Sequence, residues 1–213
     1  MLVWGTGNNG QLGLGQFDKQ KQPITFKESP TPLVGLFGKQ IRHLAAGSNH
    51  VLALTEHGSV YSWGMGKDGR LGHNDYYDRW EPTLIEKLSR KHTKGTSYRI
   101  TVIGAGHAHS IACFDNGRRV YTWGRGAHGR LGTGRHLNVK SPFEMTHNFP
   151  ASYLENGFRV VKAALGGAHT LVLCERNVEA RLTNPWGVET KLYAWGYGRH
   201  GQVRQSDERR QQA

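Results

Sequence analysis

The stretch WGMGKDGRLG, residues 63–72, contains glycines in the spacing G-x-G-x-x-G. Dinucleotide-binding loops share this spacing, because glycines let the backbone approach a pyrophosphate at the start of a helix. The spacing recurs in this chain as WGTGNNGQLG at 4–13, WGRGAHGRLG at 123–132 and WGYGRHGQVR at 195–204. No helical periodicity follows the third glycine, so the context of a nucleotide site is missing. A motif present in four copies predicts a structural element instead.

A second sequence motif recurs at a fixed distance from the glycine-rich motif. It reads AAGSNHVLAL at 45–54, GAGHAHSIAC at 104–113 and LGGAHTLVL at 165–173, with G-x-x-H as its shared core. The tryptophan of one motif precedes the histidine of the next by 46 residues in all three cases. The repeat period is about 60 residues, which is typical of a solenoid, a propeller or an array.

Each repeat predicts a β-hairpin. VLALT at 51–55 and SVYSWG at 59–64 flank the short polar turn Glu56-His57-Gly58, and residues 110–114 and 119–123 flank Asp115-Asn116-Gly117. Apolar residues that alternate on both sides of such a turn indicate antiparallel strands. We therefore expect an all-β array of small antiparallel sheets.

The paired signatures G-x-x-H and Y-x-W-G-x-G-x-x-G resemble the repeat named for the regulator of chromosome condensation. The resemblance implies a β-propeller, usually a closed ring of about seven blades in that family. At the period above, this chain would supply three to four blades, roughly half of such a ring. We expect residues 1–204 to form one incomplete propeller domain and residues 205–213 a polar tail. Another chain or a further segment would then complete the ring.

Three sets of repeated residues are expected to hold the blades together. The tryptophans are large apolar plates that would pack between neighbouring blades, and each histidine would tie a loop to backbone groups. A metal site is the alternative for the histidines, but equivalent positions lie in different blades and metal ligands must converge. The glycines would allow sharp turns. The residues are Trp63, Trp123, Trp195, His50, His109, His169, Gly64, Gly66, Gly69, Gly124, Gly126 and Gly129.

The charge is strongly positive and unevenly distributed. The net charge is +12, and residues 116–143 contain no acidic residue. Because the repeated turns should fall on one face, their cations predict a basic ridge that binds an acidic partner, either RNA or a protein polymer such as a microtubule. A solvated surface is the alternative. The predicted ridge comprises Lys67, Arg70, Arg118, Arg119, Arg125, Arg130, Arg135, Lys140 and Arg199.

The third hairpin contains an insertion. It is 12 residues longer than the first two hairpins, because it contains residues 174–191, CERNVEARLTNPWGVETK. Insertions leave the repeat core untouched, and exposed tryptophans favour interfaces, so Trp186 is a candidate partner-binding residue. The alternative is that Trp186 folds back onto its own blade.

No catalytic motif is found, which predicts a protein that is not an enzyme and needs no cofactor or metal. The leading hypothesis is an interaction scaffold that docks on protein subunits of a large assembly through its basic face. Guanine-nucleotide exchange on a small GTPase, which the resemblance implies, is one alternative, although the wedge-like loop of that activity has no match here. Direct nucleic-acid binding is another. Two isolated cysteines, Cys113 and Cys174, and the lack of a long apolar segment predict an intracellular, reducing location and no membrane partner.

Overall fold

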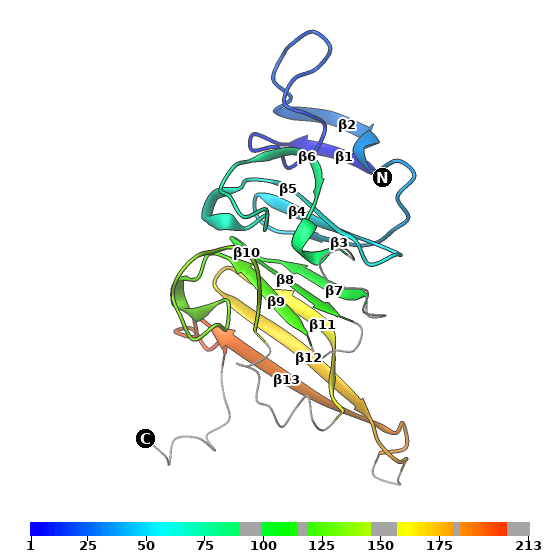
Figure 1. Ribbon diagram of the computed structural model, residues 1–213, viewed down its shortest axis with the longest axis vertical. Coiled ribbons are helices and arrows are strands. Elements are labelled where there is room, and N and C mark those ends of the chain that lie inside the picture. The colour runs from blue at the N-terminus through cyan, green and yellow to red at the C-terminus, as the bar shows by residue number, and fades with distance from the viewer. Residues whose placement is uncertain (90–98, 115–118, 146–156, 181–183, 204–213) are drawn as a thin grey trace.

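The computed structural model describes residues 1–89, 99–114, 119–145, 157–180 and 184–203. Its strands form four antiparallel sheets that follow one another along the chain and stack in an arc (Figure 1). This architecture confirms the predicted all-β, partial propeller. We refer to the sheets as the first to the fourth, in chain order.

The two central sheets each have four strands in sequential order. The second sheet contains β3 (Ile41–Ala46), β4 (His50–Thr55), β5 (Val60–Gly64) and β6 (Arg79–Leu84). The third contains β7 (Ile100–Ala105), β8 (His109–Phe114), β9 (Val120–Gly124) and β10 (Val139–Glu144). The hairpins predicted around 51–63 and 110–123 are therefore present as β4–β5 and β8–β9.

The outer sheets have fewer strands among the described residues. The first pairs β1 (Leu2–Thr6) with β2 (Phe26–Pro32), which correspond to the last two strands of a complete sheet. The fourth has the order β11-β12-β13 and corresponds to the first three. Its strands are β11 (Arg159–Leu165), β12 (His169–Asn177) and β13 (Val188–Gly196).

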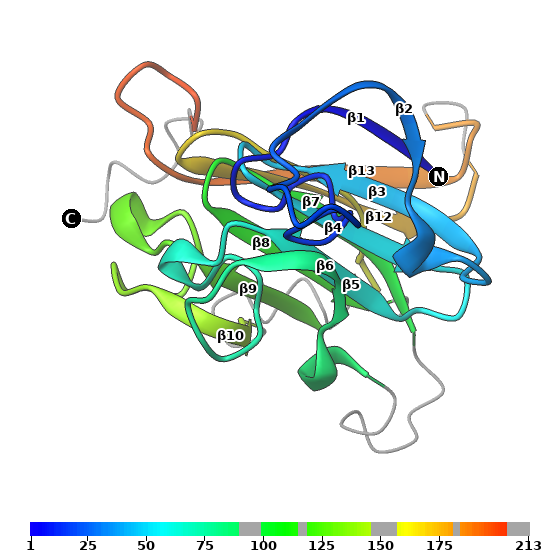
Figure 2. The same cartoon turned by 90° about the horizontal axis from the view of Figure 1, so that it is seen from above.

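Short 3-10 turns complete the repeats. η1 (Val34–Leu36) follows β2 and η3 (Glu86–Leu88) follows β6, whereas η2 (Lys67–Gly69) and η4 (Ala127–Gly129) lie within the glycine-rich turns. The glycine-rich turns project from the same end of the stack, on the left in Figures 1 and 2. The opposite end of the sheets, where β3, β7 and β11 begin, is called the far end below.

The hydrophobic core lies between sheets. Leu52, Leu54 and Val60 of the second sheet pack against Phe114 and Trp123 of the third in one buried cluster. A second cluster joins Ile111, Val120 and Met145 of the third sheet to Val172 of the fourth. Because each sheet presents one apolar face to the sheet before it and one to the sheet after it, neighbouring repeats hold each other in place.

Candidate functional site

The glycine-rich turn folds on itself and does not form a phosphate cradle. The amide of Gly66 donates to Asp78 Oδ1 at 2.8 Å, and that of Gly126 donates to Asn138 Oδ1 at 3.0 Å. Gly64 has φ +105°, and a Cβ there would lie 2.8 Å from the Cα of His50. The glycines are thus required by backbone geometry, and these amides already have side-chain acceptors from their own sheet.

The tryptophans bridge successive sheets, as predicted. Trp63 and Trp123 are fully buried. Each indole Nε1 donates to a backbone carbonyl in the preceding turn: Trp63 to Gln11 at 2.9 Å, Trp123 to Arg70 at 2.9 Å and Trp195 to Arg130 at 3.0 Å. The ring supplies apolar contact, and its polar edge fixes the position of the neighbouring turn.

The histidines also join successive sheets, but through a different partner from the one predicted. His50 Nε2 lies 3.0 Å from Ser110 Oγ, and His109 Nε2 lies 2.9 Å from Thr170 Oγ1. The sequence predicted a tie to backbone groups, whereas the side-chain partner of each ring is a hydroxyl of the next sheet. The hydroxyls were not singled out from the sequence, although a Ser or Thr directly follows His109 and His169 in the repeated G-x-x-H element.

The hydrogen-bond network fixes the tautomer of both rings. Ser110 Oγ donates its single proton to the carbonyl of Arg70 at 2.8 Å, so it must accept from His50 Nε2–H. Burial, followed by the nearby Arg70, lowers the pKa of His50 to about 3. Burial and Arg130 lower the pKa of His109 to about 3 as well. Both imidazoles are therefore neutral near pH 7.

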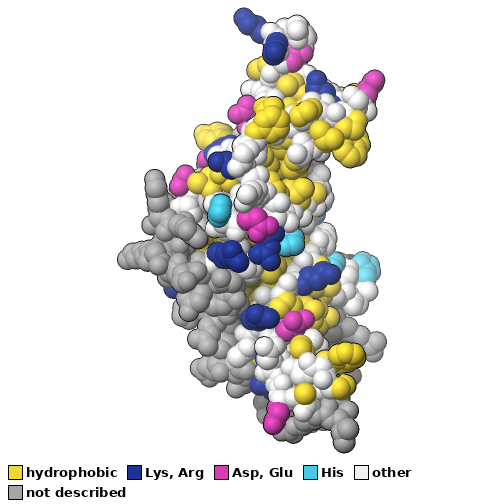
Figure 3. All heavy atoms as spheres, turned by 90° about the vertical axis from the view of Figure 1, so that its right-hand side faces the viewer, with side chains coloured by type: hydrophobic (Ala, Val, Ile, Leu, Met, Phe, Trp, Pro, Cys, Tyr) yellow, Lys and Arg dark blue, Asp and Glu magenta, His cyan; other side chains and the backbone are white. Residues whose placement is uncertain are grey.

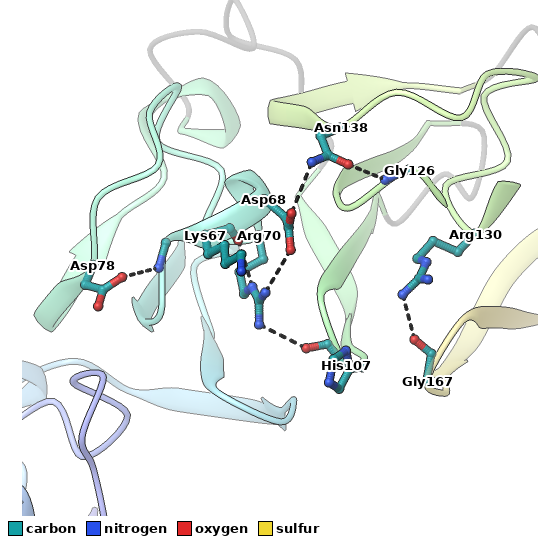
Figure 4. Close-up of polar contacts among 10 residues, drawn as sticks. Lys67, Asp68, Arg70, Asp78, His107, Gly126, Arg130, Asn138 and Gly167 are labelled. Carbon is teal, nitrogen blue, oxygen red and sulfur yellow. Dashed lines mark hydrogen bonds and ion pairs between the residues drawn. The ribbon is translucent and has the colours of Figure 1, made fainter. Parts of the chain in front are cut away.

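Arg70 and Arg130 are buried, which corrects the prediction that they line an exposed ridge. Each is only 3% exposed. Arg70 Nη1 donates to the carbonyl of His107 at 3.2 Å, and Arg130 Nη1 donates to the carbonyl of Gly167 at 2.8 Å (Figure 4). Because each arginine begins in one sheet's turn and bonds to the next sheet, it fastens neighbouring sheets together. We call the set Arg70, His50, Ser110 and Trp123, with its equivalent Arg130, His109, Thr170 and Trp195, the intersheet clasp.

The remaining cations of the turns are exposed. They come from the turns themselves, from the loop before β10, and from β10: Lys67, Arg125, Arg135, Lys140 and Arg199. Asn138 Nδ2 donates to Asp68 Oδ1 at 3.1 Å and so holds the loop before β10 against the preceding turn. These five cations form the exposed basic ridge in the text that follows.

Arg119 lies apart from the ridge. It immediately precedes β9, whereas Arg125 immediately follows it, so the two lie at opposite ends of the sheet. Arg119 pairs with Glu144 at 3.8 Å. Its assignment to the ridge was therefore wrong, and Arg118 lies outside the described residues. Arg42, Arg99 and Arg159 are also exposed at the far end, and Figure 3 shows lysine and arginine side chains gathered across the middle of that side.

The insertion extends the third hairpin outward. β12 and β13 each span nine residues, and the bond from Arg176 Nε to Glu189 Oε2 at 2.7 Å links the extension across the pair. Trp186 is 86% exposed, so it does not fold back onto the sheet. Its role in partner binding stays a prediction.

The described part of the chain contains no group of three His, Cys, Asp or Glu residues placed to hold a metal ion. Cys113 and Cys174 are free, buried and part of the core between the third and fourth sheets. Burial raises the pKa of the Cys174 thiol to about 11 and that of Cys113 above its usual range, which makes both poor nucleophiles. None of the described helices is long and apolar enough to span a bilayer.

Two relatives match this chain in sequence over most of its length. The Arabidopsis thaliana ultraviolet-B receptor UVR8 is 33% identical over 94% of this chain, and the probable E3 ubiquitin-protein ligase HERC4 of Homo sapiens is 32% identical over 95%. The chain spans 38% of the first relative and 16% of the second. It therefore corresponds to part of each of these proteins.

Among solved structures, Prp20p of Saccharomyces cerevisiae, studied for its binding to Gsp1p and histones, matches with a TM-score of 0.70 and 28% identity. The match covers 98% of this chain and 44% of that one. The same yeast protein has also been crystallised bound to Kap60. The family model for the regulator of chromosome condensation repeat matches residues 1–54, 57–113 and 119–173. The chain belongs to the regulator of chromosome condensation (RCC1) repeat family.

Proposed function

We propose that this chain is a non-catalytic interaction scaffold that docks on an acidic protein surface through the exposed basic ridge. The observation that carries the proposal is that some cations of the turns are buried between sheets and the others are exposed. Arg70 and Arg130 donate hydrogen bonds within the intersheet clasp. The five cations of the exposed basic ridge face solvent instead: Lys67, Arg125, Arg135, Lys140 and Arg199. Exposed like charges on one face attract polyanionic surfaces.

A protein partner is favoured over RNA for two reasons. The yeast relative Prp20p is described by its binding to other proteins. In addition, acidic Asp68 and Asp75 lie between the cations of the second sheet, where they pair with Arg70 and Arg79. A mixed surface suits protein charge patterns better than a continuous phosphate backbone. Exchange activity on a small GTPase is the alternative that the family resemblance suggests.

The test is binding of the chain to preassembled microtubules, by co-sedimentation over a series of salt concentrations. The ridge variant combines Lys67→Glu, Arg125→Glu and Arg135→Glu. Its matched control combines Arg42→Glu, Arg99→Glu and Arg159→Glu, which reverse the same number of exposed charges at the far end. We expect the ridge variant to lose at least tenfold in affinity, about 1.4 kcal/mol, while the control stays close to wild type.

Three outcomes would contradict the proposal. The ridge variant and the control variant could bind microtubules equally, which would mean that the exposed basic ridge does not bind this partner. Binding of the wild type could be insensitive to salt, which exposed charge pairs do not allow. Finally, a fluorescent single-stranded RNA could bind tightly with a steep salt dependence while microtubules do not, which would favour the nucleic-acid alternative.

A further inference from the structure

The first strands of the second, third and fourth sheets, β3, β7 and β11, each contain a β-bulge close to their start. In β3 the pairing register with β4 passes over Arg42. In β7 and β11 it passes over Thr101 and Val161, respectively. A bulge inserts an extra residue that the partner strand does not match, and it turns the side chain of that residue in a new direction.

The bulged residues of the three sheets line one pocket at the far end. β7 contacts both β3 and β11, which brings the three bulges close together (Figure 1). The pocket has a volume of about 280 Å³, and its lining includes Arg42, Thr101 and Val161 together with His43 and Arg159. No acidic residue is among the described residues that line it, so the pocket is basic.

The donors of this pocket are free to bind a ligand. Arg42 and Arg159 are exposed, and neither forms an ion pair or a hydrogen bond within the part of the chain that the structure describes. The hydroxyl of Thr101 has no partner there either. Arg99, which occupies the position of Arg159 in the preceding repeat, differs because its Nη1 donates to the carbonyl of Glu56 at 3.3 Å.

This set of donors suits a phosphate group better than a carboxylate. A carboxylate is planar, and a single guanidinium can satisfy it through two parallel hydrogen bonds. A phosphate monoester carries close to two negative charges at neutral pH and has three terminal oxygens, so it can accept from two guanidinium groups and a hydroxyl at once. The volume of the pocket lies near the lower limit for small-molecule sites, about 300 Å³, which fits a phosphate on a short organic group.

We propose that the pocket between the three bulges binds a phosphate monoester. Arg42 of β3 and Arg159 of β11 would donate to its oxygens from two sides, and Thr101 of β7 would donate from between them. A phosphorylated serine of a partner protein and a small phosphorylated molecule both carry this group. The pocket lies at the opposite end of the sheets from the exposed basic ridge, so the inference does not depend on the proposed function.

The test measures binding of a fluorescent peptide, with one phosphoserine between uncharged residues, to the full chain by anisotropy at physiological salt. Peptides with serine or glutamate at the same position should bind at least about tenfold more weakly. Arg42→Gln and Arg159→Gln should each weaken binding of the phosphopeptide by about tenfold or more, because each removes hydrogen bonds from a charged group. Arg99→Gln is the matched control, since it removes the same charge at the same end of the molecule, and it should stay within about twofold of wild type.

Phenyl phosphate, added as a competitor, should displace the peptide, because the phosphate supplies the atoms that are recognised. Tighter binding of the peptide than of phenyl phosphate would assign the site to a phosphorylated side chain, and the reverse order would assign it to a small molecule.

Four results would overturn the proposal: no saturable binding of the phosphopeptide, equal binding of the glutamate peptide, no displacement by phenyl phosphate, or an equal loss in Arg99→Gln and Arg42→Gln. The exposed basic ridge is left intact in every variant and no microtubules are used, so failure here is distinguishable from failure of the proposed function.

Discussion

Arg70 joins two sheets through both its backbone carbonyl and its side chain. The carbonyl of Arg70 accepts from Ser110 and Trp123, while its guanidinium reaches His107 in the next sheet. Three groups of the third sheet therefore bond to one residue, Arg70, in the turn of the second sheet. A buried polar network of this kind is rigid when every member has a partner and costly when one member is removed.

Replacing Thr170 with Val should test the clasp with almost no change in volume. The substitution leaves His109 Nε2–H buried without its acceptor. An unsatisfied buried donor costs about 1–3 kcal/mol, so the free energy of unfolding in urea should fall by that amount. Thr133→Val is the control, since Thr133 makes only a long hydrogen bond, 3.3 Å, to Arg135. Equal losses of unfolding free energy for Thr170→Val and Thr133→Val would mean that the intersheet clasp does not stabilise the fold.

Acidification should destabilise the fold through the same histidines. Their pKa in the folded chain is about 3, whereas the unfolded pKa is about 6.5, so below pH 6.5 the unfolded chain binds more protons. Stability is therefore retained above pH 6.5 and lost as the pH falls toward 3. Between pH 7 and pH 5, where carboxylates hardly titrate, each histidine should remove about 2 kcal/mol.

Urea unfolding at the two pH values measures this loss. His73, whose pKa burial lowers to about 4, adds to the total, so the decisive comparison is between variants. His109→Gln should show a smaller drop than the wild type between pH 7 and pH 5. The same drop in both proteins would contradict the assignment of a neutral, buried His109.

At the scale of elements, the repeated motifs predicted the hairpins because their apolar alternation and turn residues are local signals. The burial of Trp63 and Trp123 also followed from the repeat, since a large ring at a fixed position in every unit needs a neighbour to cover it. The buried state of Arg70 and Arg130 did not follow from the sequence. Arg125 and Arg130 lie five residues apart in the same turn, and only the position of the next sheet decides which of them is covered.

The contact between a turn and the next fourth strand predicts different costs for two equivalent glycines. Gly69→Ala and Gly129→Ala carry the same left-handed strain, of order 1 kcal/mol, because φ is +77° and +69°. Only at Gly69 would the new methyl group also meet Lys140 of β10. Chemical denaturation should therefore show a clearly larger loss of stability for Gly69→Ala. Equal losses would contradict the packing of η2 against β10.

At the scale of the whole molecule, the described chain is an arc whose two ends present apolar surface. Trp4 of the first sheet is 61% exposed, although its equivalents Trp63 and Trp123 are buried. Leu192 of the fourth sheet is exposed in the same way. Both side chains occupy positions that a neighbouring sheet covers elsewhere in the arc.

Between these ends, the buried cations Arg70 and Arg130 hold neighbouring sheets together, whereas the exposed cations are proposed to bind a partner. The most direct test compares Arg130→Gln with Arg125→Glu, each measured by urea unfolding and by microtubule co-sedimentation. Glutamine is the residue that this chain itself carries at the equivalent positions 11 and 202. We predict that Arg130→Gln loses about 1.5–3 kcal/mol of stability, the range for a hydrogen bond from a charged group, with binding nearly unchanged. Arg125→Glu should lose binding while its stability stays within about 0.5 kcal/mol of wild type. The reverse pattern, or equal effects of both substitutions on binding, would contradict the account.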